Sequence, residues 1–342
     1  MKSNVKKIVL AVIVVAVISV LSFVNLPVWA IAPGKAQEVA KLIKIQGSNN
    51  AEGASHVLMT DVTLGPVSPL EWLIDKMNSN VDLVPSSAIL GNAPSSSFIP
   101  TQLDEMRQSQ QAATVAALTY LGYNLNEVKG AIVVGIAKVS VVSSLLHPGD
   151  LITQINGVAV DSAAQLVSVI SSYKPKETIK ISYIPAADVA NRPAVQSAYK
   201  TVSVELGARP GDTTQPYLGI NISDGVSYKT PFKVTISAPG IGGPSAGLAF
   251  TLGIIDRLQG GGLTKGNTVA ATGTIAPNGA VGDVGGVPQK TIAVERAGAK
   301  LFLVPPQEYK AALSKATPQL KVEAVSTLKQ AVADVKAFAA SS

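Results

Sequence analysis

An unbroken apolar run close to the N-terminus limits what this chain can fold into more than any other feature. The run extends from Ile8 to Val24, and its apolar character continues after one asparagine as far as Ala32. A helix of about 20 apolar residues crosses the hydrocarbon core of a bilayer, so residues 1–32 are predicted to form a cytoplasmic tip and a transmembrane signal anchor. Lysines precede the run, and positive charge on that flank keeps the N-terminus in the cytoplasm and places the rest of the chain outside.

A cleaved signal peptide is the alternative interpretation, because Ala30-Ile31-Ala32 has the small-x-small form of a cleavage site. Two features favour an anchor that is kept: the apolar run is long, and Pro33 would directly follow the cut. Trp29 is then expected at the membrane interface. Both interpretations place the bulk of the protein outside the cytoplasm. The anchor that is kept, which we favour, holds it at the cell membrane.

The amino-acid counts exclude several classes of site. The chain has 342 residues, which suits two or three domains, and no cysteine, which removes disulfides, thiolate zinc sites and cysteine nucleophiles. The net charge of +6 is spread out, without a basic block interleaved with aromatic residues, so nucleic acid is not expected as a partner. We predict neither a metal site nor a cofactor.

Residues 33–124 show no recognisable chemistry and are predicted to be an extracytoplasmic spacer of unclear fold. Alternating apolar residues predict a strand over 57–64, and a proline opens a short predicted helix over 69–77. Ser, Pro and Asn are frequent over 86–100, which is typical of a loop, and 102–121 is predicted to be a helix.

Short strands are predicted over residues 125–207, and a hairpin is their most specific feature. Asn156-Gly157 is a strong hairpin turn, because both residues tolerate positive φ. The sequence "HPGDLITQINGVAV" followed by a helix resembles a bacterial PDZ domain. The resemblance implies a strand to whose edge an extended peptide would add, at Gly130, Ala131, Ile132 and Val133. The alternative is a small β-sandwich in which the hairpin is only structural.

Strands and helices alternate over residues 215–340, which predicts an α/β domain. Its most telling stretch is Gly243-Pro244-Ser245-Ala246-Gly247, at the start of an apolar helix predicted from Ser245 to about Arg257. A hydroxyl at such a turn is a candidate nucleophile if a base lies beside it. Without a base, a serine at this place is simply a good helix N-cap.

The base for Ser245 has to be something other than a downstream histidine. Both histidines, His56 and His147, precede the serine, whereas the nucleophile elbow of α/β-hydrolases needs one after it. A lysine can take the proton only as a neutral amine, and burial can lower its pKa from about 10.4 by several units. Lys290 fits best, because it follows a glycine-rich turn and has an apolar helix behind it.

Three stretches together resemble the proteolytic domain of Lon-type serine peptidases: "GGPSAG", "ATGTIAPNGAVGDVGGVPQK" and "AGAKLFLVP". The resemblance implies Ser245 as the nucleophile, Lys290 as the general base and Thr272 as a hydroxyl that orients the lysine. It also implies an oxyanion hole formed by backbone N–H groups around Gly243, Pro244 and the serine, at a helix N-terminus.

Thr274 departs from this pattern, since many Lon proteins have a carboxylate there. The chain as a whole resembles the membrane-anchored, PDZ-containing Lon-like proteases of bacteria, and its fold class is multidomain: a transmembrane helix, a PDZ-like β-rich domain and a C-terminal α/β Lon-type proteolytic domain. It has no phosphate-binding Gly-x-x-x-x-Gly-Lys-Ser/Thr loop, so ATP is not expected as a partner.

The implied function is an ATP-independent, membrane-tethered serine endopeptidase that cleaves exported peptides or flexible protein segments outside the cytoplasm. Because Lon-type domains tend to form rings, a homo-oligomer is one implied form. A catalytically silent scaffold is the alternative, in which the PDZ-like groove holds partner proteins at the membrane.

Overall fold

The chain folds into two units, one of which interrupts the other. The computed structural model describes residues 22, 24–47, 56–189, 192–193 and 199–341. Unit 1 takes its described residues from 1–43, 51–116 and 237–342, and unit 2 takes them from 44–50 and 117–236. Unit 2 is therefore an insertion within unit 1, whereas the sequence predicted a series of consecutive domains.

The apolar run predicted as a membrane anchor lies outside the described residues, except for Ser22 and Val24. Among the helices that the structure describes, none has both the length and the apolar character needed to cross a bilayer. The predicted range 1–32 extends too far at its C-terminal end, because strand β1 begins at Val28. Trp29 of this strand is buried, and its ring packs edge-on against that of Phe98.

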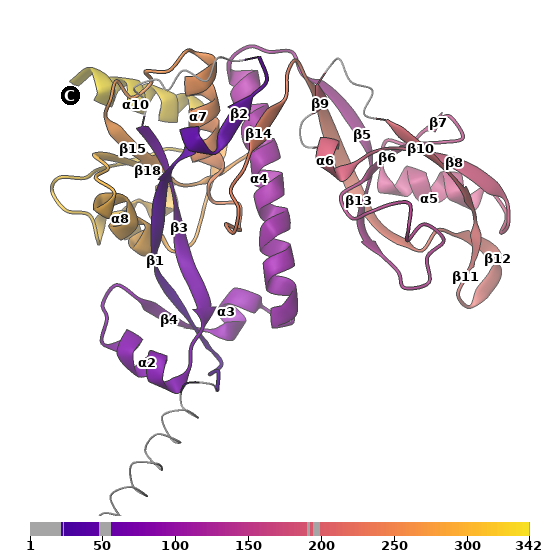
Figure 1. The fold of residues 1–342 in the computed structure, drawn as a ribbon, viewed down its shortest axis with the longest axis horizontal. Helices are drawn as coiled ribbons and strands as arrows, with labels where there is room; N and C mark the ends of the chain where they lie inside the picture. Colours follow the sequence, from indigo (N-terminus) through magenta and orange to yellow (C-terminus); the bar gives the residue numbers. More distant parts are fainter. Residues whose placement is uncertain (1–21, 23, 48–55, 190–191, 194–198, 342) are drawn as a thin grey trace, which may run out of the picture. The chain divides into compact units, whose positions relative to one another are not determined.

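Unit 1 is built on a six-stranded sheet in the order β19-β18-β15-β3-β1-β4 (Figure 1). Its strands are β1 (Val28–Glu38), β3 (His56–Pro66), β4 (Asp82–Pro85), β15 (Thr268–Ala271), β18 (Leu301–Val304) and β19 (Lys321–Ala324). β3, β15, β18 and β19 run parallel, and β1 lies antiparallel between β3 and β4. The first half of this sheet therefore comes from residues 28–85 and the second half from residues 268–324.

The prediction that residues 33–124 form a spacer is wrong, because they complete this sheet. β3 pairs directly with β15, with His56 opposite Thr268. The predicted strand 57–64 and the predicted helix 69–77 are confirmed as β3 and as α2 (Pro69–Lys76). Composition could not reveal that these elements belong to the C-terminal α/β domain, because their pairing partners are far along the chain.

Helices cover both faces of the sheet (Figure 1). The helices of unit 1 are α2, α3 (Ser86–Leu90), α4 (Phe98–Tyr120, which continues into unit 2), α7 (Gly247–Leu258), α8 (Val287–Arg296), α9 (Tyr309–Leu313) and α10 (Leu328–Ser341), with 3-10 turns η1 (Val39–Lys41), η2 (Ser95–Ser97) and η3 (Pro306–Glu308). α8 and α9 pack on one face, where Leu58 and Phe302 share a core with Val294. Strand β18 is apolar and buried at every position, as a parallel strand covered on both faces must be.

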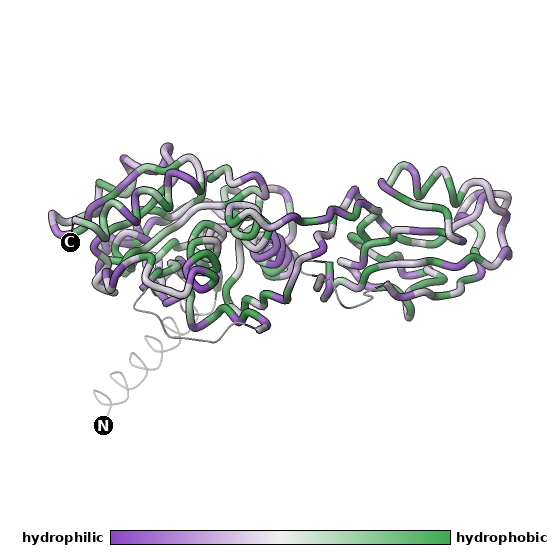
Figure 2. Tube along the Cα trace, turned by 90° about the horizontal axis from the view of Figure 1, so that it is seen from above, coloured by the Kyte–Doolittle hydropathy of each residue, from purple (hydrophilic) through white to green (hydrophobic). Residues whose placement is uncertain are grey.

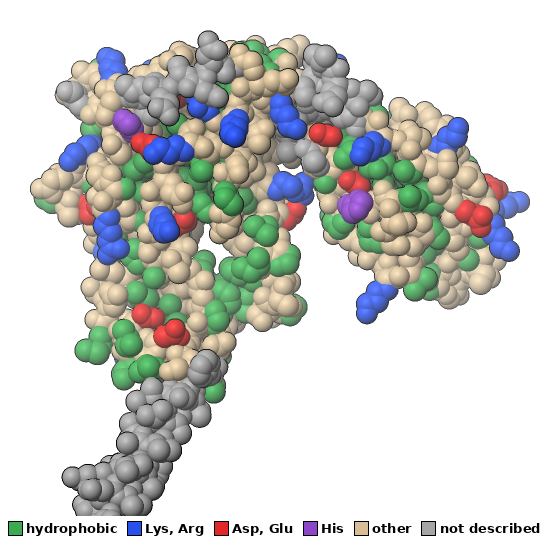
Figure 3. All heavy atoms as spheres, in the orientation of Figure 1, with side chains coloured by type: hydrophobic (Ala, Val, Ile, Leu, Met, Phe, Trp, Pro, Cys, Tyr) green, Lys and Arg blue, Asp and Glu red, His purple; other side chains and the backbone are tan. Residues whose placement is uncertain are grey.

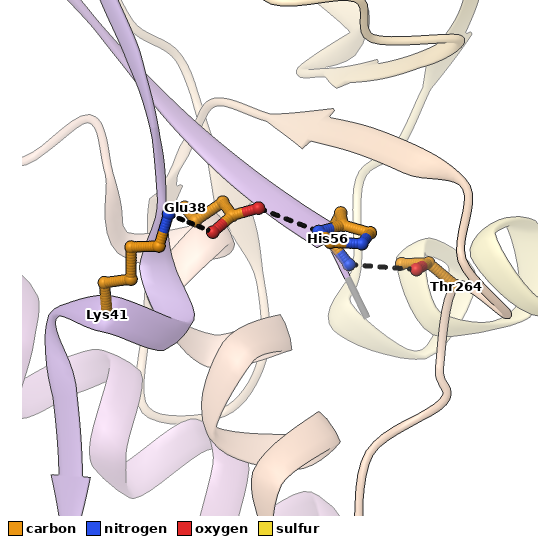
Figure 4. Close-up of polar contacts among 4 residues, drawn as sticks. All are labelled: Glu38, Lys41, His56 and Thr264. Atoms are coloured by element: carbon orange, nitrogen blue, oxygen red, sulfur yellow. Dashed lines mark hydrogen bonds and ion pairs between the residues drawn. The ribbon is translucent and has the colours of Figure 1, made fainter. Parts of the chain in front are cut away.

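A small polar cluster holds the beginning of β3 in place (Figure 4). Glu38, at the end of β1, lies 2.7 Å from Lys41 Nζ and 2.7 Å from His56 Nδ1. The backbone N–H of His56 donates to Thr264 Oγ1 at 3.1 Å. Hydrogen bonds from Lys41 and His56 hold the pKa of Glu38 below its ordinary value. The cluster joins β1 and β3 to the loop that follows α7.

Unit 2 is a sheet in the order β10-β8-β6-β5-β13-β9, with β7 paired to β6. Its elements are β5 (Asn126–Ile136), β6 (Leu151–Ile155), β7 (Val158–Ala159), α5 (Ala163–Ser171), β8 (Thr178–Ile184), α6 (Ala186–Val189), β9 (Arg192–Pro193), β10 (Lys200–Glu205), the hairpin of β11 (Gly207–Arg209) and β12 (Asp212–Tyr217), and β13 (Ile220–Thr230). A separate two-stranded sheet pairs β2 (Ile43–Ile45) with β14 (Val234–Ile236). Leu166 and Ile170 of α5 enter the same core as Ile155 of β6.

The hairpin turn predicted at Asn156-Gly157 is confirmed, with φ of 49° and 83° at the two residues. The predicted domain boundaries at 125–207 and 215–340 are not confirmed. β13 pairs with β5 along its length, so residues assigned to the proteolytic domain belong to unit 2. Hydrophobic residues run along the strands of each unit (Figure 2).

Candidate active site

The loop over residues 242–247 holds the predicted nucleophile, Ser245. Helix α7 begins at Gly247, two residues later than predicted, with Ala246 as its N-cap. No side chain caps this helix. The alternative role of Ser245 as an N-cap is therefore contradicted, and its half-buried hydroxyl is not used to hold α7.

Thr272 brings the nucleophile loop and the predicted base together at the carboxyl end of β15. Lys290 Nζ donates to Thr272 Oγ1 at 3.2 Å, and this hydroxyl in turn donates to the backbone oxygen of Ser245 at 3.2 Å. The N–H of Gly273 donates to the same oxygen at 2.9 Å. Ser245 and Lys290 are thus linked through Thr272, and no hydrogen bond joins Ser245 Oγ directly to Lys290 Nζ in the described part of the chain.

Lys290 lies in the first turns of α8 and is buried, with 2% of its surface exposed. Desolvation by this burial lowers the pKa of its amine from 10.5 to about 8. The helix starts close to β3, because its N-cap Gly286 has a φ of 68° and a Cβ there would lie 2.8 Å from Val62 Cγ1. A substantial fraction of the amine is therefore neutral near pH 8, as a general base must be.

Two carboxylates oppose this lowering. The charges of Asp61 on β3 and of Glu308 in η3 both raise the pKa of Lys290, without overcoming desolvation. Asp61 is held in place by the N–H of Lys35, which donates to its Oδ1 at 2.7 Å in the irregular part of β1. The sequence did not single out Asp61, because it lies in the region that showed no chemistry.

Replacing Asp61 with asparagine is expected to lower the pKa of Lys290 below about 8. The amide keeps the oxygen that accepts from Lys35 but removes the negative charge that favours the ammonium form. The rise of kcat/KM with pH should then begin at lower pH, with the same plateau. A pH–rate profile measures this shift, with Asp334→Asn on α10 as the matched control. A midpoint that stays in place or moves upward would contradict the role of Asp61.

Helix α4 forms two hydrogen bonds with the nucleophile loop. Ser109 Oγ donates to the backbone oxygen of Pro244 at 2.9 Å, and the N–H of Gly243 donates to the backbone oxygen of Gln102 at 2.8 Å. Gly243 has a φ of 83°, and a Cβ there would lie 2.9 Å from Gln102 Oε1, so only glycine fits. Sequence reasoning missed Gln102 and Ser109, because a polar residue on a helix carries no motif.

The contact with Gln102 changes the expected oxyanion hole. The N–H of Gly243 is already engaged, and Pro244 has no N–H. Of the three residues expected to supply donors, only Ser245 keeps an N–H to which no described group is bound. Of these three residues, Ser245 is therefore the one whose N–H is available to a substrate carbonyl.

His56 is not placed to serve Ser245. His56 begins β3, and its partner in parallel register is Thr268, the first residue of β15, whereas Thr272 follows the last. His56 is thus at the other end of the parallel strands and is bound to Glu38. His147 belongs to unit 2, where its N–H donates to Asp150 Oδ2.

The peptide-binding position predicted at Gly130, Ala131, Ile132 and Val133 is corrected by the sheet order. These residues lie in β5, which pairs with β6 on one side and with β13 on the other. An interior strand has no edge to which a peptide can add. Next to α5 lies β13, which pairs with β9 only at Lys229 and Thr230, and whose Asp224 accepts from the N–H of Ala163 at 2.8 Å.

Comparisons with known proteins identify both units. Residues 233–339 match the Lon protease (S16) C-terminal proteolytic domain, and residues 119–206 match the PDZ domain. Both domains are therefore present in this chain, and the first indicates a serine peptidase. The match to the proteolytic domain leaves out β1, β3 and α4, although these elements complete its sheet and support its nucleophile loop.

Individual proteins are similar to parts of this chain. Lon protease 2 of Bacillus subtilis is 35% identical over 107 residues, which are 30% of this chain and 19% of that protein. This chain therefore spans about a fifth of that relative's length. The PDZ domain of the SdrC-like protein of Listeria monocytogenes is 27% identical over 27% of this chain and 86% of that structure, with a TM-score of 0.22. Its counterpart from Listeria innocua is 26% identical over 27% and 92%, with a TM-score of 0.23.

Proposed function

We propose that this chain is an ATP-independent, membrane-tethered serine endopeptidase that uses Ser245 as nucleophile and Lys290 as general base. One observation carries the proposal: a lysine amine that is 2% exposed is hydrogen-bonded to Thr272, which is itself hydrogen-bonded to the backbone of Ser245. Among the described residues no carboxylate forms an ion pair with this amine, and a buried amine without such a pair is costly to a fold. Catalysis that uses the neutral amine would explain why Lys290 is buried despite this cost.

The hydrogen-bond directions suit proton transfer. The hydroxyl hydrogen of Thr272 goes to the backbone oxygen of Ser245, so its oxygen accepts an N–H of Lys290. The lone pair of the neutral amine is then left to take the proton of Ser245 Oγ as the hydroxyl attacks a substrate carbonyl. The resulting ammonium returns that proton to the leaving amine, and water releases the acyl group in the reverse order of steps.

The proposed substrates are peptides or flexible protein segments outside the cytoplasm. An extended segment can enter a loop site that a folded domain cannot, and the sequence has no phosphate-binding loop to drive unfolding. The proposed tether is the apolar run from Ile8 to Val24. A homo-oligomer of the proteolytic units is part of the same proposal.

In unit 2 we place peptide binding at β13 instead of β5. Along Ile220–Gly225 no described strand pairs with the outer edge of β13, and α5 lies beside it. Peptides add to an open strand edge in this way in PDZ domains. If the peptidase activity is absent, this edge supports the alternative function of a scaffold that binds partner proteins at the membrane.

The test is cleavage of a peptide library by the full chain, followed by mass spectrometry. Ser245→Ala is expected to abolish cleavage, because methyl cannot attack a carbonyl, and to leave the melting temperature unchanged, because Oγ caps no helix. Ser314→Ala, at an exposed serine after α9, is the matched control. Cleavage by Ser245→Ala at the wild-type rate would overturn the proposal, and binding without turnover in the wild type would favour the scaffold.

A further inference from the structure

Helix α2 turns its apolar stripe away from the protein. Its large apolar residues recur at Leu70, Leu73, Ile74 and Met77, the spacing that normally faces a core. Here all four are exposed, with 55% of Leu73, 60% of Ile74 and 86% of Met77 accessible. No residue of α2 is buried.

The helix is nevertheless firmly defined. Ser68 and Glu71 form a reciprocal capping box at its start, and Pro69 occupies its first turn. On the side that faces the protein, Trp72 is half-buried, and Lys76 Nζ lies over its ring, 4.6 Å from the ring centroid. The stripe is therefore held outward by a well-capped helix.

The beginning of α4 adds to the same kind of surface. Ile99 and Leu103 are one helical turn apart, and both are exposed. Hydrophobic side chains gather over α2 and over this end of α4 at one end of unit 1 (Figure 3). Soluble single chains seldom leave such a group of large apolar side chains in water.

The residues that directly follow the N-terminal apolar run are hydrogen-bonded to a residue just before the start of α2. The N–H of Leu26 donates to the backbone oxygen of Val67 at 2.8 Å, and the N–H of Val67 donates to that of Val28 at 3.2 Å. Val67 directly precedes Ser68, the N-cap of α2. Leu26, two residues after the end of the run at Val24, is thus hydrogen-bonded to the residue that precedes the N-cap of α2.

We propose that this surface, the α2 face (Leu70, Leu73, Ile74 and Met77 with Ile99 and Leu103), inserts into the headgroup region of the bilayer that holds the N-terminal run. The proposal rests on the membrane tether of the proposed function. It adds a second, monotopic contact that fixes the catalytic unit against the membrane surface. Trp72, on the opposite side of α2, then lies about one helix diameter from the inserted side chains and still within the headgroup region, which tryptophan prefers.

The chemistry of the helix points to insertion of apolar side chains and not to ionic attraction. α2 carries two carboxylates, Glu71 and Asp75, against one ammonium, Lys76. A surface of this charge gains nothing from anionic lipids, in contrast to a basic amphipathic helix. Zwitterionic phosphatidylcholine is therefore the lipid with which to test the contact.

The experiment uses the full chain in phosphatidylcholine vesicles brominated near the top of the acyl chains. Trp29 and Trp72 are the two tryptophans of the chain, and Trp29 is buried. We expect bromine to quench roughly half of the total tryptophan emission, because only Trp72 lies at the interface. Sodium chloride at high concentration should leave the quenching unchanged.

The double variant Leu73→Glu/Ile74→Glu should lose this quenching at least several-fold while it still floats with the vesicles. Leu313→Glu, at an exposed leucine of α9, is the matched control and should be quenched like the wild type. Wild-type protein that floats without quenching would overturn the proposal. So would quenching abolished by salt, or an α2 face that cross-links to a second copy of the chain.

The same samples separate this proposal from the proposed function. Chain that does not float shows that the tether fails, and the contact of the α2 face fails with it. Cleavage of peptides by the wild type and its loss in Ser245→Ala report on the catalytic proposal independently of quenching. A floating, cleaving and unquenched protein refutes the α2 face alone.

Discussion

Replacing Lys290 with methionine is expected to reduce peptide cleavage by about 10³- to 10⁴-fold, as removal of a general base does. Methionine has a similar length and packs in apolar surroundings, but it cannot take a proton from Ser245. Because Lys290 is buried in α8, the substitution leaves the helix and its packing in place. Turnover of the peptides found with the wild type measures the loss.

The same substitution is expected to raise the free energy of unfolding. The pKa of Lys290 falls from 10.5 to about 8 on folding, so the unfolded chain binds this proton more tightly. Below pH 8 both states are protonated, and the folded state carries a penalty of about 3 kcal/mol, which disappears as the pH rises through the range between the two pKa values. Methionine removes the penalty at pH 7, offset in part by the lost hydrogen bond to Thr272. Urea denaturation at pH 7 measures the gain.

The pH dependence of the wild type follows from the same pKa. Below pH 8 the fraction of neutral amine falls about tenfold per unit, so kcat/KM at pH 6 should be about one hundredth of its plateau. Lys310→Met, at an exposed lysine of α9, is the control and should change neither rate nor stability. A Lys290→Met variant that still cleaves, or that unfolds more easily, would show that the amine serves the structure and not the chemistry.

Ser245 and Lys290 could be proposed from the sequence because each lies beside a glycine-rich turn, whereas Thr272 came only from the resemblance to Lon-type peptidases. The structure joins the three through two hydrogen bonds. The Asn156-Gly157 hairpin was likewise predictable, since a type of turn depends on its own two residues.

The rest of the fold depends on pairing between distant parts of the chain. Val28–Ala32 is an apolar stretch of strand β1, and composition alone does not separate such a strand from the end of a membrane run. Strand β13 follows the predicted PDZ-like range 125–207 in sequence like the start of a new domain, yet it pairs with β5 and belongs to unit 2. Ser109 acts on the nucleophile loop through one hydrogen bond across a packed interface, which no spacing rule encodes.

The fragment 215–342, which contains the range 215–340 predicted to be the proteolytic domain, is expected to be unfolded and inactive by itself. Without β3, the edge of β15 is left unpaired, and Pro244 loses the hydrogen bond from Ser109. The missing segments also contribute buried apolar side chains to unit 1, including Val39, Ile43, Val57, Leu58 and Met59. At about 1.5–3 kcal/mol each, these five are worth roughly 10 kcal/mol, which is comparable to the whole stability of a domain.

Circular dichroism during heating distinguishes the outcomes. Fragment 215–342 should show no cooperative transition and no cleavage, while 25–342 should melt cooperatively and cleave. Fragment 117–236 is the control, because it contains the complete core of unit 2, from Ala131 to Ile222, and should fold alone. If 215–342 melts cooperatively and cleaves peptides, then β1, β3 and α4 are accessories to the catalytic unit. If it does neither, the catalytic unit needs a strand from each half of a divided sequence, and insertion of a PDZ domain between them leaves that pairing intact.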